Sequence, residues 1–280
     1  MPPAAHYAGD VSATAAEPPG RPAAFFDLDK TIIAKSSTLA FSKPFFAGGL
    51  INRRSALRSA YAQFMFALSG VDDDQMEKMR AYLTALCAGW DVQTVREIVS
   101  ETLHTIVEPL VYEEAVSLMA EHRAAGRDVV IVSASGSEVA EPIGAMLGAD
   151  EVIATRLVEV DGRYTGEIGF YAYAENKAVA MAEIAARNGY DLDTSYAYSD
   201  SETDAPMLTA VGKPFVVNPD KALRRLAAER DWPVLRFAKP VALKPRVGLD
   251  LTTGRVAAAG LAIGAVSAGV VAHQIRRRRA

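Results

Sequence analysis

The chain has 280 residues, half of them hydrophobic, which is enough for one large domain or for a core with a smaller inserted domain. The formal net charge is only −4, and this argues against a nucleic-acid-binding protein, because such proteins are usually basic. Cys87 is the sole cysteine, so no disulfide can form within the chain, and we expect a reducing, cytoplasmic compartment.

The first 108 residues contain three stretches of different composition. Residues 1–22 are rich in Ala, Pro and Gly and lack the basic start and apolar run of a secretory signal, so we expect a disordered segment. Residues 23–28 form a short apolar run that ends in an acid, as a buried strand does. Residues 36–108 carry apolar residues at helical spacing, which predicts an all-helical insertion.

Strand and helix patterns alternate from residue 109 onward. Predicted helices cover residues 109–125, 137–147, 176–188, 205–211 and 220–229. Predicted strands cover residues 128–132, 151–154, 155–160, 163–168, 195–198, 214–217 and 234–237, with a hairpin turn at Asp161-Gly162. This alternation predicts an α/β core with a mostly parallel sheet, built from residues 23–35 and 109–240 and interrupted by the helical domain at 36–108.

Residues 247–280 form an apolar C-terminal tail. The stretch 256–272 contains no charged residue, and four arginines follow at 276–279. A membrane span needs about 20 apolar residues, so this stretch is short for one. We expect membrane association through residues 256–275, at the inner face of the cell membrane. A surface-packed or disordered Ala-rich segment is the alternative, and basic residues on both sides leave the orientation open.

Three of the predicted strands end in polar residues. In open α/β sheets, ligands bind outside the carboxyl ends of the strands, so these side chains are expected to meet at one mouth. They are Asp27, Asp29 and Thr31 after the first strand, Ser133 and Ser135 after the second, and Asp200, Ser201 and Asp204 after a third, with Lys177 on the first turn of a helix.

These residue types suit phosphoryl transfer. Asp27 is a plausible nucleophile, because carboxylates form aspartyl-phosphates, and Asp29 could act as general acid and then activate water. A phosphate dianion would repel a bare carboxylate, and a Mg²⁺ ion together with Lys177 would offset that repulsion. Asp27 and Asp200 could supply ligands for the ion, with Asp204 beside them, and Thr31 and Ser133 could donate hydrogen bonds to the phosphate.

The run Asp27-Leu28-Asp29-Lys30-Thr31 after an apolar strand resembles the DxDxT signature of the haloacid dehalogenase superfamily. Ser133, Lys177 and the pair Asp200 and Asp204 resemble its three later motifs, in order and at similar spacing. The resemblance spans about residues 23–237 and is nearest to subfamily IB, the branch of phosphoserine-phosphatase-like enzymes.

The resemblance implies a Rossmann-like, doubly wound core with a helical cap domain at 36–108. It implies that Asp27 is the nucleophile and Asp29 the acid and base. It also implies that Mg²⁺ is bound by the Asp27 side chain, the Asp29 backbone carbonyl and Asp200, with Asp204 adjoining. The phosphate-binding set is then Thr31, Ser133, Ala134 and Lys177. Family members that cleave carbon–halogen bonds lack the second Asp, so a phosphatase is favoured.

Several positions depart from the phosphoserine-specific pattern. Ser36-Ser37 stand where those enzymes carry a glutamate that binds the substrate amine, and Ala134 stands where a glycine usually follows the second motif. The substrate is therefore left open between a small phosphorylated metabolite and a lipid phosphate.

Two other functions stay open at this point: a non-catalytic, membrane-tethered module on the same fold, and phosphoryl transfer to an acceptor other than water. The individual motifs also have structural alternatives, since a strand-end acid can cap a helix and lysines are common at helix starts.

Overall fold

The computed structural model describes residues 20–51 and 85–238, which belong to one compact unit that spans residues 1–243. The predicted disordered segment lies outside these ranges up to residue 19, and so does the apolar tail at 247–280. Within the described ranges, no helix is both long and apolar enough to cross a membrane. The membrane prediction for residues 256–275 concerns residues beyond them.

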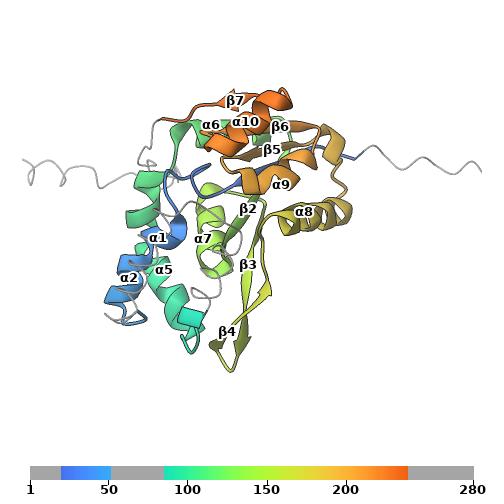
Figure 1. Ribbon diagram of the computed structural model, residues 1–280. Helices are drawn as coiled ribbons and strands as arrows, with labels where there is room; N and C mark the ends of the chain where they lie inside the picture. Colours follow the sequence, from blue (N-terminus) through green and yellow to red (C-terminus); the bar gives the residue numbers. More distant parts are fainter. Residues whose placement is uncertain (1–19, 52–84, 239–280) are drawn as a thin grey trace, which may run out of the picture. The chain divides into compact units, whose positions relative to one another are not determined.

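A seven-stranded sheet forms the centre of the described unit (Figure 1), with the strand order β4-β3-β2-β1-β5-β6-β7. The strands are β1 (Ala23–Asp27), β2 (Asp128–Gly136), β3 (Glu151–Val160), β4 (Arg163–Phe170), β5 (Tyr196–Ser199), β6 (Lys213–Val217) and β7 (Val234–Leu235). All neighbouring strands pair in parallel except β3 and β4, which are antiparallel. The predicted α/β fold class, with its mostly parallel sheet, is therefore confirmed.

β1 is the central strand, and every one of its residues is buried. Its register pairs Asp27 with Val132 of β2 and Phe26 with Tyr198 of β5. Because all three strands run in parallel, Ser133 of β2 and Ser199, the last residue of β5, lie at the same end of the sheet as Asp27. Pairing register thus brings together residues that lie more than 100 positions apart in the chain.

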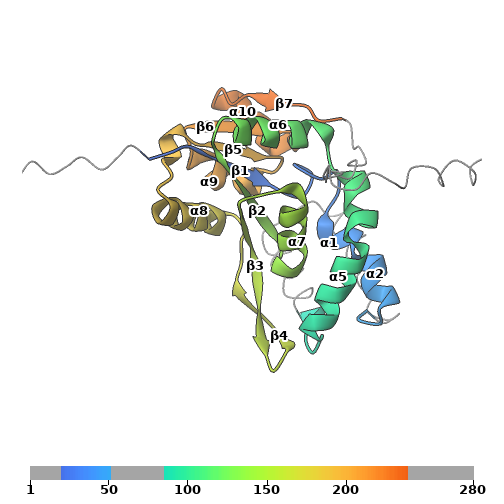
Figure 2. The same ribbon diagram turned by 180° about the vertical axis from the view of Figure 1, so that it is seen from behind.

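Helices cover both faces of the sheet (Figures 1 and 2). The helices of the core are α6 (Glu113–Ala124), α7 (Ser137–Leu147), α8 (Glu175–Asn188), α9 (Ala205–Thr209) and α10 (Lys221–Glu229), with 3-10 turns η1 (Glu108–Leu110), η2 (Leu192–Thr194) and η3 (Glu202–Asp204). Buried residues of α6 and α7 belong to one hydrophobic cluster, and those of α8, α9 and α10 belong to another. Successive side chains of a buried strand point to opposite faces, and accordingly Phe25 lies in the second cluster and Phe26 in the first.

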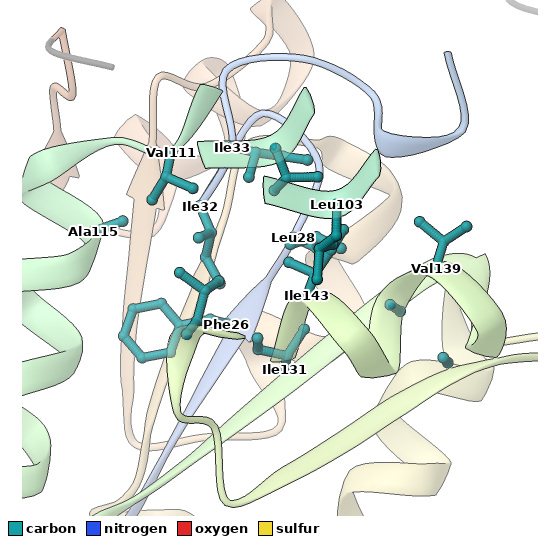
Figure 3. Close-up of a cluster of buried hydrophobic side chains, with 14 of the residues drawn as sticks. Phe26, Leu28, Ile32, Ile33, Leu103, Val111, Ala115, Ile131, Val139 and Ile143 are labelled. Carbon is teal, nitrogen blue, oxygen red and sulfur yellow. The ribbon is translucent and has the colours of Figure 1, made fainter. Parts of the chain in front are cut away.

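The helices described between β1 and α6 include α1 (Ser37–Ala40), α2 (Ser42–Ala47) and α5 (Val92–Val107), joined by turns and loops. α5 begins at its N-cap Asp91, whose side chain accepts a hydrogen bond from the Thr94 N–H. Leu103 of α5 packs in the same cluster as Phe26 of β1 and Ile143 of α7 (Figure 3). The predicted cap at 36–108 includes residues 52–84, which are outside the described ranges, so its boundaries remain a prediction.

Four predicted elements need correction. β2 continues to Gly136 instead of ending at 132, and residues 151–154 and 155–160 form one strand, β3. The Thr155 hydroxyl donates to the Ala134 carbonyl oxygen at 2.7 Å, and this tertiary bond links β3 to the extended end of β2. The helix expected at 109–125 begins only at Glu113, after the 3-10 turn η1. The hairpin at Asp161-Gly162 is confirmed, with positive φ angles of 50° and 73°.

Candidate active site

Asp27 ends the central strand and is only 6 % exposed. The chain turns directly afterwards, because the N–H groups of Ile32 and Ile33 both donate to the Leu28 carbonyl oxygen. Lys30 adopts a φ of 63° within this turn, a left-handed conformation that non-glycine residues seldom occupy. The turn returns Thr31 to the same edge, where its hydroxyl lies 3.5 Å from Asp200 Oδ1.

Lys177 connects two of the acids. It lies on the first turn of α8 and is 2 % exposed. Its Nζ donates to Asp27 Oδ1 at 2.7 Å and to Asp204 Oδ2 at 2.8 Å. The residue that precedes α8, Ala174, has a φ of 48°, an unfavourable angle for a residue with a Cβ. The strained backbone at Ala174 therefore directly precedes the helical turn that carries Lys177.

The loop after β5 supplies Asp200 and Asp204. Asp204 Oδ2 also accepts a hydrogen bond from the Ser199 hydroxyl at 2.6 Å, so this oxygen has two donors. Asp220, the N-cap of α10, braces the loop: its N–H donates to the Asp200 carbonyl oxygen, and its side chain accepts from the Glu202 N–H. Ser199 and Asp220 were not predicted as site residues. The position of Ser199 at a strand end, directly before Asp200, was the available signal.

The site holds more buried acidic side chains than buried basic ones. Asp27, Asp200 and Asp204 are all buried, and Lys177 is the buried lysine among them. Burial raises the pKa of Asp27 to about 8; Asp204 and Asp200 act in the same direction, and Lys177 opposes them. Burial likewise raises the pKa of Asp200 to about 6, with Lys30 opposing and Asp204 adding to the rise. Burial alone would lower the pKa of Lys177, but Asp204 and Asp27 outweigh it and raise that pKa, so the lysine is an ammonium ion.

The donor set fits a hard divalent cation. Carboxylate and carbonyl oxygens are the ligands that Mg²⁺ prefers, and an added cation would offset the excess negative charge of three buried acids beside one lysine. Within the described residues, no group of three His, Cys, Asp or Glu side chains is spaced to hold a metal. The predicted site does not need one, because it uses two carboxylates and the Asp29 backbone carbonyl.

Asp29 has its own set of partners. Its Oδ1 accepts from the Ser37 N–H at 2.7 Å, and its Oδ2 accepts from the Ser135 hydroxyl at 3.0 Å. Ser133 is 1 % exposed, and its hydroxyl oxygen accepts from the Ser135 N–H at 3.1 Å. Ala134 adjoins these residues on β2. The structure thus brings together the predicted residues of four separate chain segments at one edge of the sheet.

Comparison with known proteins identifies the family. The model of the haloacid dehalogenase-like hydrolases matches residues 24–209, which include all the site residues predicted from the sequence. The chain belongs to this family, and it is an enzyme of the hydrolase class. The family resemblance expected from the sequence motifs is confirmed.

Two curated relatives cover nearly the whole chain. A protein of Streptomyces azureus, named inhibition of morphological differentiation protein, is 60 % identical over 92 % of this chain and 95 % of its own. A probable phosphatase of Mycobacterium tuberculosis is 58 % identical over 93 % of this chain and 91 % of its own.

Among solved structures, a substrate-bound phosphoserine phosphatase matches with a TM-score of 0.56 and 18 % identity. The match covers 79 % of this chain and 94 % of that one. At this identity the likeness concerns the fold alone. It agrees with the Rossmann-like core expected from the sequence.

Proposed function

We propose that the protein is a Mg²⁺-dependent phosphatase that hydrolyses a phosphomonoester through an aspartyl-phosphate on Asp27. The observation that carries this proposal is the buried contact of Lys177 with both Asp27 and Asp204, at the carboxyl end of the central strand. A buried carboxylate held beside an ammonium group is suited to meet an anionic phosphate. The probable phosphatase of Mycobacterium tuberculosis, at 58 % identity, supports the same reaction class.

The reaction would proceed in two steps. An oxygen of Asp27 attacks phosphorus, and the bond from phosphorus to the leaving oxygen breaks while Asp29 gives that oxygen its proton. Asp29, now a carboxylate, then takes a proton from water, and the resulting hydroxide attacks phosphorus and releases Asp27 with inorganic phosphate. Lys177 holds one carboxylate oxygen of Asp27 and supplies positive charge beside the reacting group.

The Asp27 side chain, the Asp29 backbone carbonyl and Asp200 would hold the magnesium ion, and Asp204 would adjoin them. When bound, the ion offsets the charge of the phosphate oxygens. Thr31, Ser133 and the backbone N–H of Ala134 would donate hydrogen bonds to the phosphate, with Lys177 as its cationic partner. The hydroxyl of Thr31 lies near Asp200, so it would have to share this contact with a bound phosphate.

We propose a small phosphorylated metabolite as the substrate class, with a lipid phosphate as the alternative if residues 256–275 contact a membrane. The sequence disfavours specificity for phosphoserine and leaves open whether phosphoserine is accepted, since Ser36 and Ser37 stand in place of the glutamate that would bind an amine. Ser37 instead contributes its N–H to Asp29 and its hydroxyl to a contact with Ser135. A panel of phosphate esters, assayed with the full chain and with a chain lacking residues 247–280, separates these substrate classes.

The decisive test is hydrolysis of p-nitrophenyl phosphate with and without EDTA. The wild-type protein should release phosphate only when Mg²⁺ is present. Phosphate release that is indifferent to chelation, or full activity of Asp27→Asn, would disprove the mechanism. Product analysis with added alcohols distinguishes transfer to water from transfer to another acceptor.

A further inference from the structure

The carboxylate of Asp29 is held at both oxygens. The Ser37 N–H donates to Oδ1 at 2.7 Å, and the Ser135 hydroxyl donates to Oδ2 at 3.0 Å. One donor belongs to α1, in the region before α6, and the other to β2 of the core. Two hydrogen bonds from different elements restrict rotation of the carboxylate about its side-chain torsions.

The Ser135 hydroxyl is itself oriented. Its oxygen lies 2.7 Å from Ser37 Oγ and 3.3 Å from Thr38 Oγ1, and Ser135 is 6 % exposed. A hydroxyl carries one proton and can accept two hydrogen bonds. The structure has the Ser135 hydroxyl donating to Asp29 Oδ2, so the proton of Ser135 is used in that bond. The hydroxyls of Ser37 and Thr38 then donate to the Ser135 oxygen. The one donor position and both acceptor positions of the Ser135 hydroxyl are therefore occupied.

We propose that Ser135 is a positioning residue that aims the Asp29 carboxyl at the leaving-group oxygen, and that Ser37 and Thr38 of α1 set its orientation. This proposal rests on the proposed function, in which Asp29 is the general acid. Because α1 begins at Ser37, the same contacts tie the start of the helical region to the acid. Neither Ser37 nor Thr38 touches Asp27, Lys177 or Asp204 through a hydrogen bond in the described part of the chain.

The consequence concerns the leaving group. As the bond between phosphorus and the leaving oxygen breaks, Asp29 transfers its proton to that oxygen and becomes a carboxylate. A poor leaving group such as phenolate depends on this proton, whereas nitrophenolate is stable enough to depart as an anion. A misaimed Asp29 should therefore slow phenyl phosphate more than p-nitrophenyl phosphate. A general loss of folding would slow both esters equally.

The experiment compares kcat/KM for the two esters, since this ratio reports the steps up to departure of the leaving group. In Ser135→Ala we expect a loss of roughly 10- to 100-fold for phenyl phosphate and of less than about threefold for p-nitrophenyl phosphate. The first loss lies at or below the lower end of the roughly 100- to 10,000-fold that general acid catalysis supplies, because Asp29 itself is retained. Ser135→Thr keeps the hydroxyl and should restore the wild-type ratio. Ser42→Ala is the matched control, because the Ser42 hydroxyl donates only to Leu39 O at an exposed position.

Equal losses for the two esters in Ser135→Ala, or no loss, would overturn the proposal. A crystal structure of Ser135→Ala tests it without kinetics: we expect the Asp29 carboxylate to leave its 2.7 Å contact with the Ser37 N–H, and an unchanged carboxylate would overturn it as well. A protein that requires Asp27 but ignores Ser135→Ala disproves only this proposal. A wild-type protein that hydrolyses neither ester disproves the proposed function too.

Discussion

Lys177 Nζ lies 2.7 Å from Asp27 Oδ1, although 150 positions separate the two residues in the chain. Both side chains are buried, and the same Nζ also contacts Asp204. A buried ammonium between two buried carboxylates stabilises the fold only as a complete set, because removal of one partner leaves uncompensated charge. The catalytic and structural consequences of these contacts can be measured separately.

The first prediction concerns the nucleophile. Asp27→Asn keeps the shape of the side chain but removes the carboxylate that would form the phosphoenzyme, so kcat should fall more than about 1000-fold. Phosphate release from p-nitrophenyl phosphate is the measurement, and circular dichroism serves as the control for folding. Retention of more than a tenth of the wild-type kcat would contradict the assignment of Asp27.

The second prediction concerns Lys177. Lys177→Met should lower the free energy of unfolding at neutral pH by about 3–5 kcal/mol, because Asp27 and Asp204 lose their buried cation. The loss should shrink as the pH falls, because burial raises the pKa of Asp27 to about 8 and a protonated Asp27 no longer needs a cation beside it. Urea denaturation in the presence of EDTA at two pH values measures both effects.

Lys213→Met is the control for Lys177→Met, since Lys213 contacts Tyr196 at an exposed position. It should change stability by less than about 0.5 kcal/mol, as surface substitutions usually do. Equal destabilisation by the two variants would show that the buried contacts of Lys177 contribute no more than a surface contact does.

The third prediction concerns the metal. Asp200→Asn removes one negative charge from the proposed ligand set and should raise the Mg²⁺ concentration for half-maximal activity at least about tenfold. Titration of EDTA-treated protein with MgCl₂ measures this concentration. Asp193→Asn, a change at an exposed aspartate away from the site, should leave it unchanged. If Asp200→Asn titrates like the wild type, Asp200 is not a ligand.

The fourth prediction concerns His122, which is buried near the C-terminal end of α6, next to Phe26 of β1. Its Nδ1 accepts from Arg127 Nε at 2.7 Å, so its Nε2 carries the proton and donates to the Tyr198 hydroxyl at 2.8 Å. Burial lowers the pKa of His122 to about 4, and the positive charge of Arg127 acts in the same direction. The folded protein therefore favours a neutral His122.

Stability should accordingly fall as the pH decreases from about 6.5 to about 4, because the unfolded chain then binds a proton that the folded protein excludes. The slope due to His122 is at most about 1.4 kcal/mol per pH unit. Urea denaturation at several pH values should show a shallower decline for His122→Asn than for the wild type. Parallel curves for His122→Asn and the wild type would refute this assignment.

Much of the fold could be predicted from local sequence patterns. The helix at Ser137–Leu147 begins and ends where predicted. It ends there because Gly148 adopts the left-handed conformation, with a φ of 70°, that terminates a helix. The hairpin at Asp161-Gly162 is likewise a local property, since both of its turn residues have positive φ angles. Strand-end acids, hydroxyls and a helix-start lysine in a fixed order sufficed to predict the family and the candidate site residues.

The tertiary structure alone decided which of those residues touch. Three hydrogen bonds join segments whose distance depends on strand order and register. They are the bonds from Lys177 to Asp204, from Ser135 to Asp29 and from the Asp220 N–H to the Asp200 carbonyl oxygen. Local sequence determines backbone preference and burial pattern through short-range sterics and hydrophobic periodicity. Contacts between distant segments arise only when the whole sheet is assembled, so the partners of Asp27 and Asp29 are properties of the packed fold.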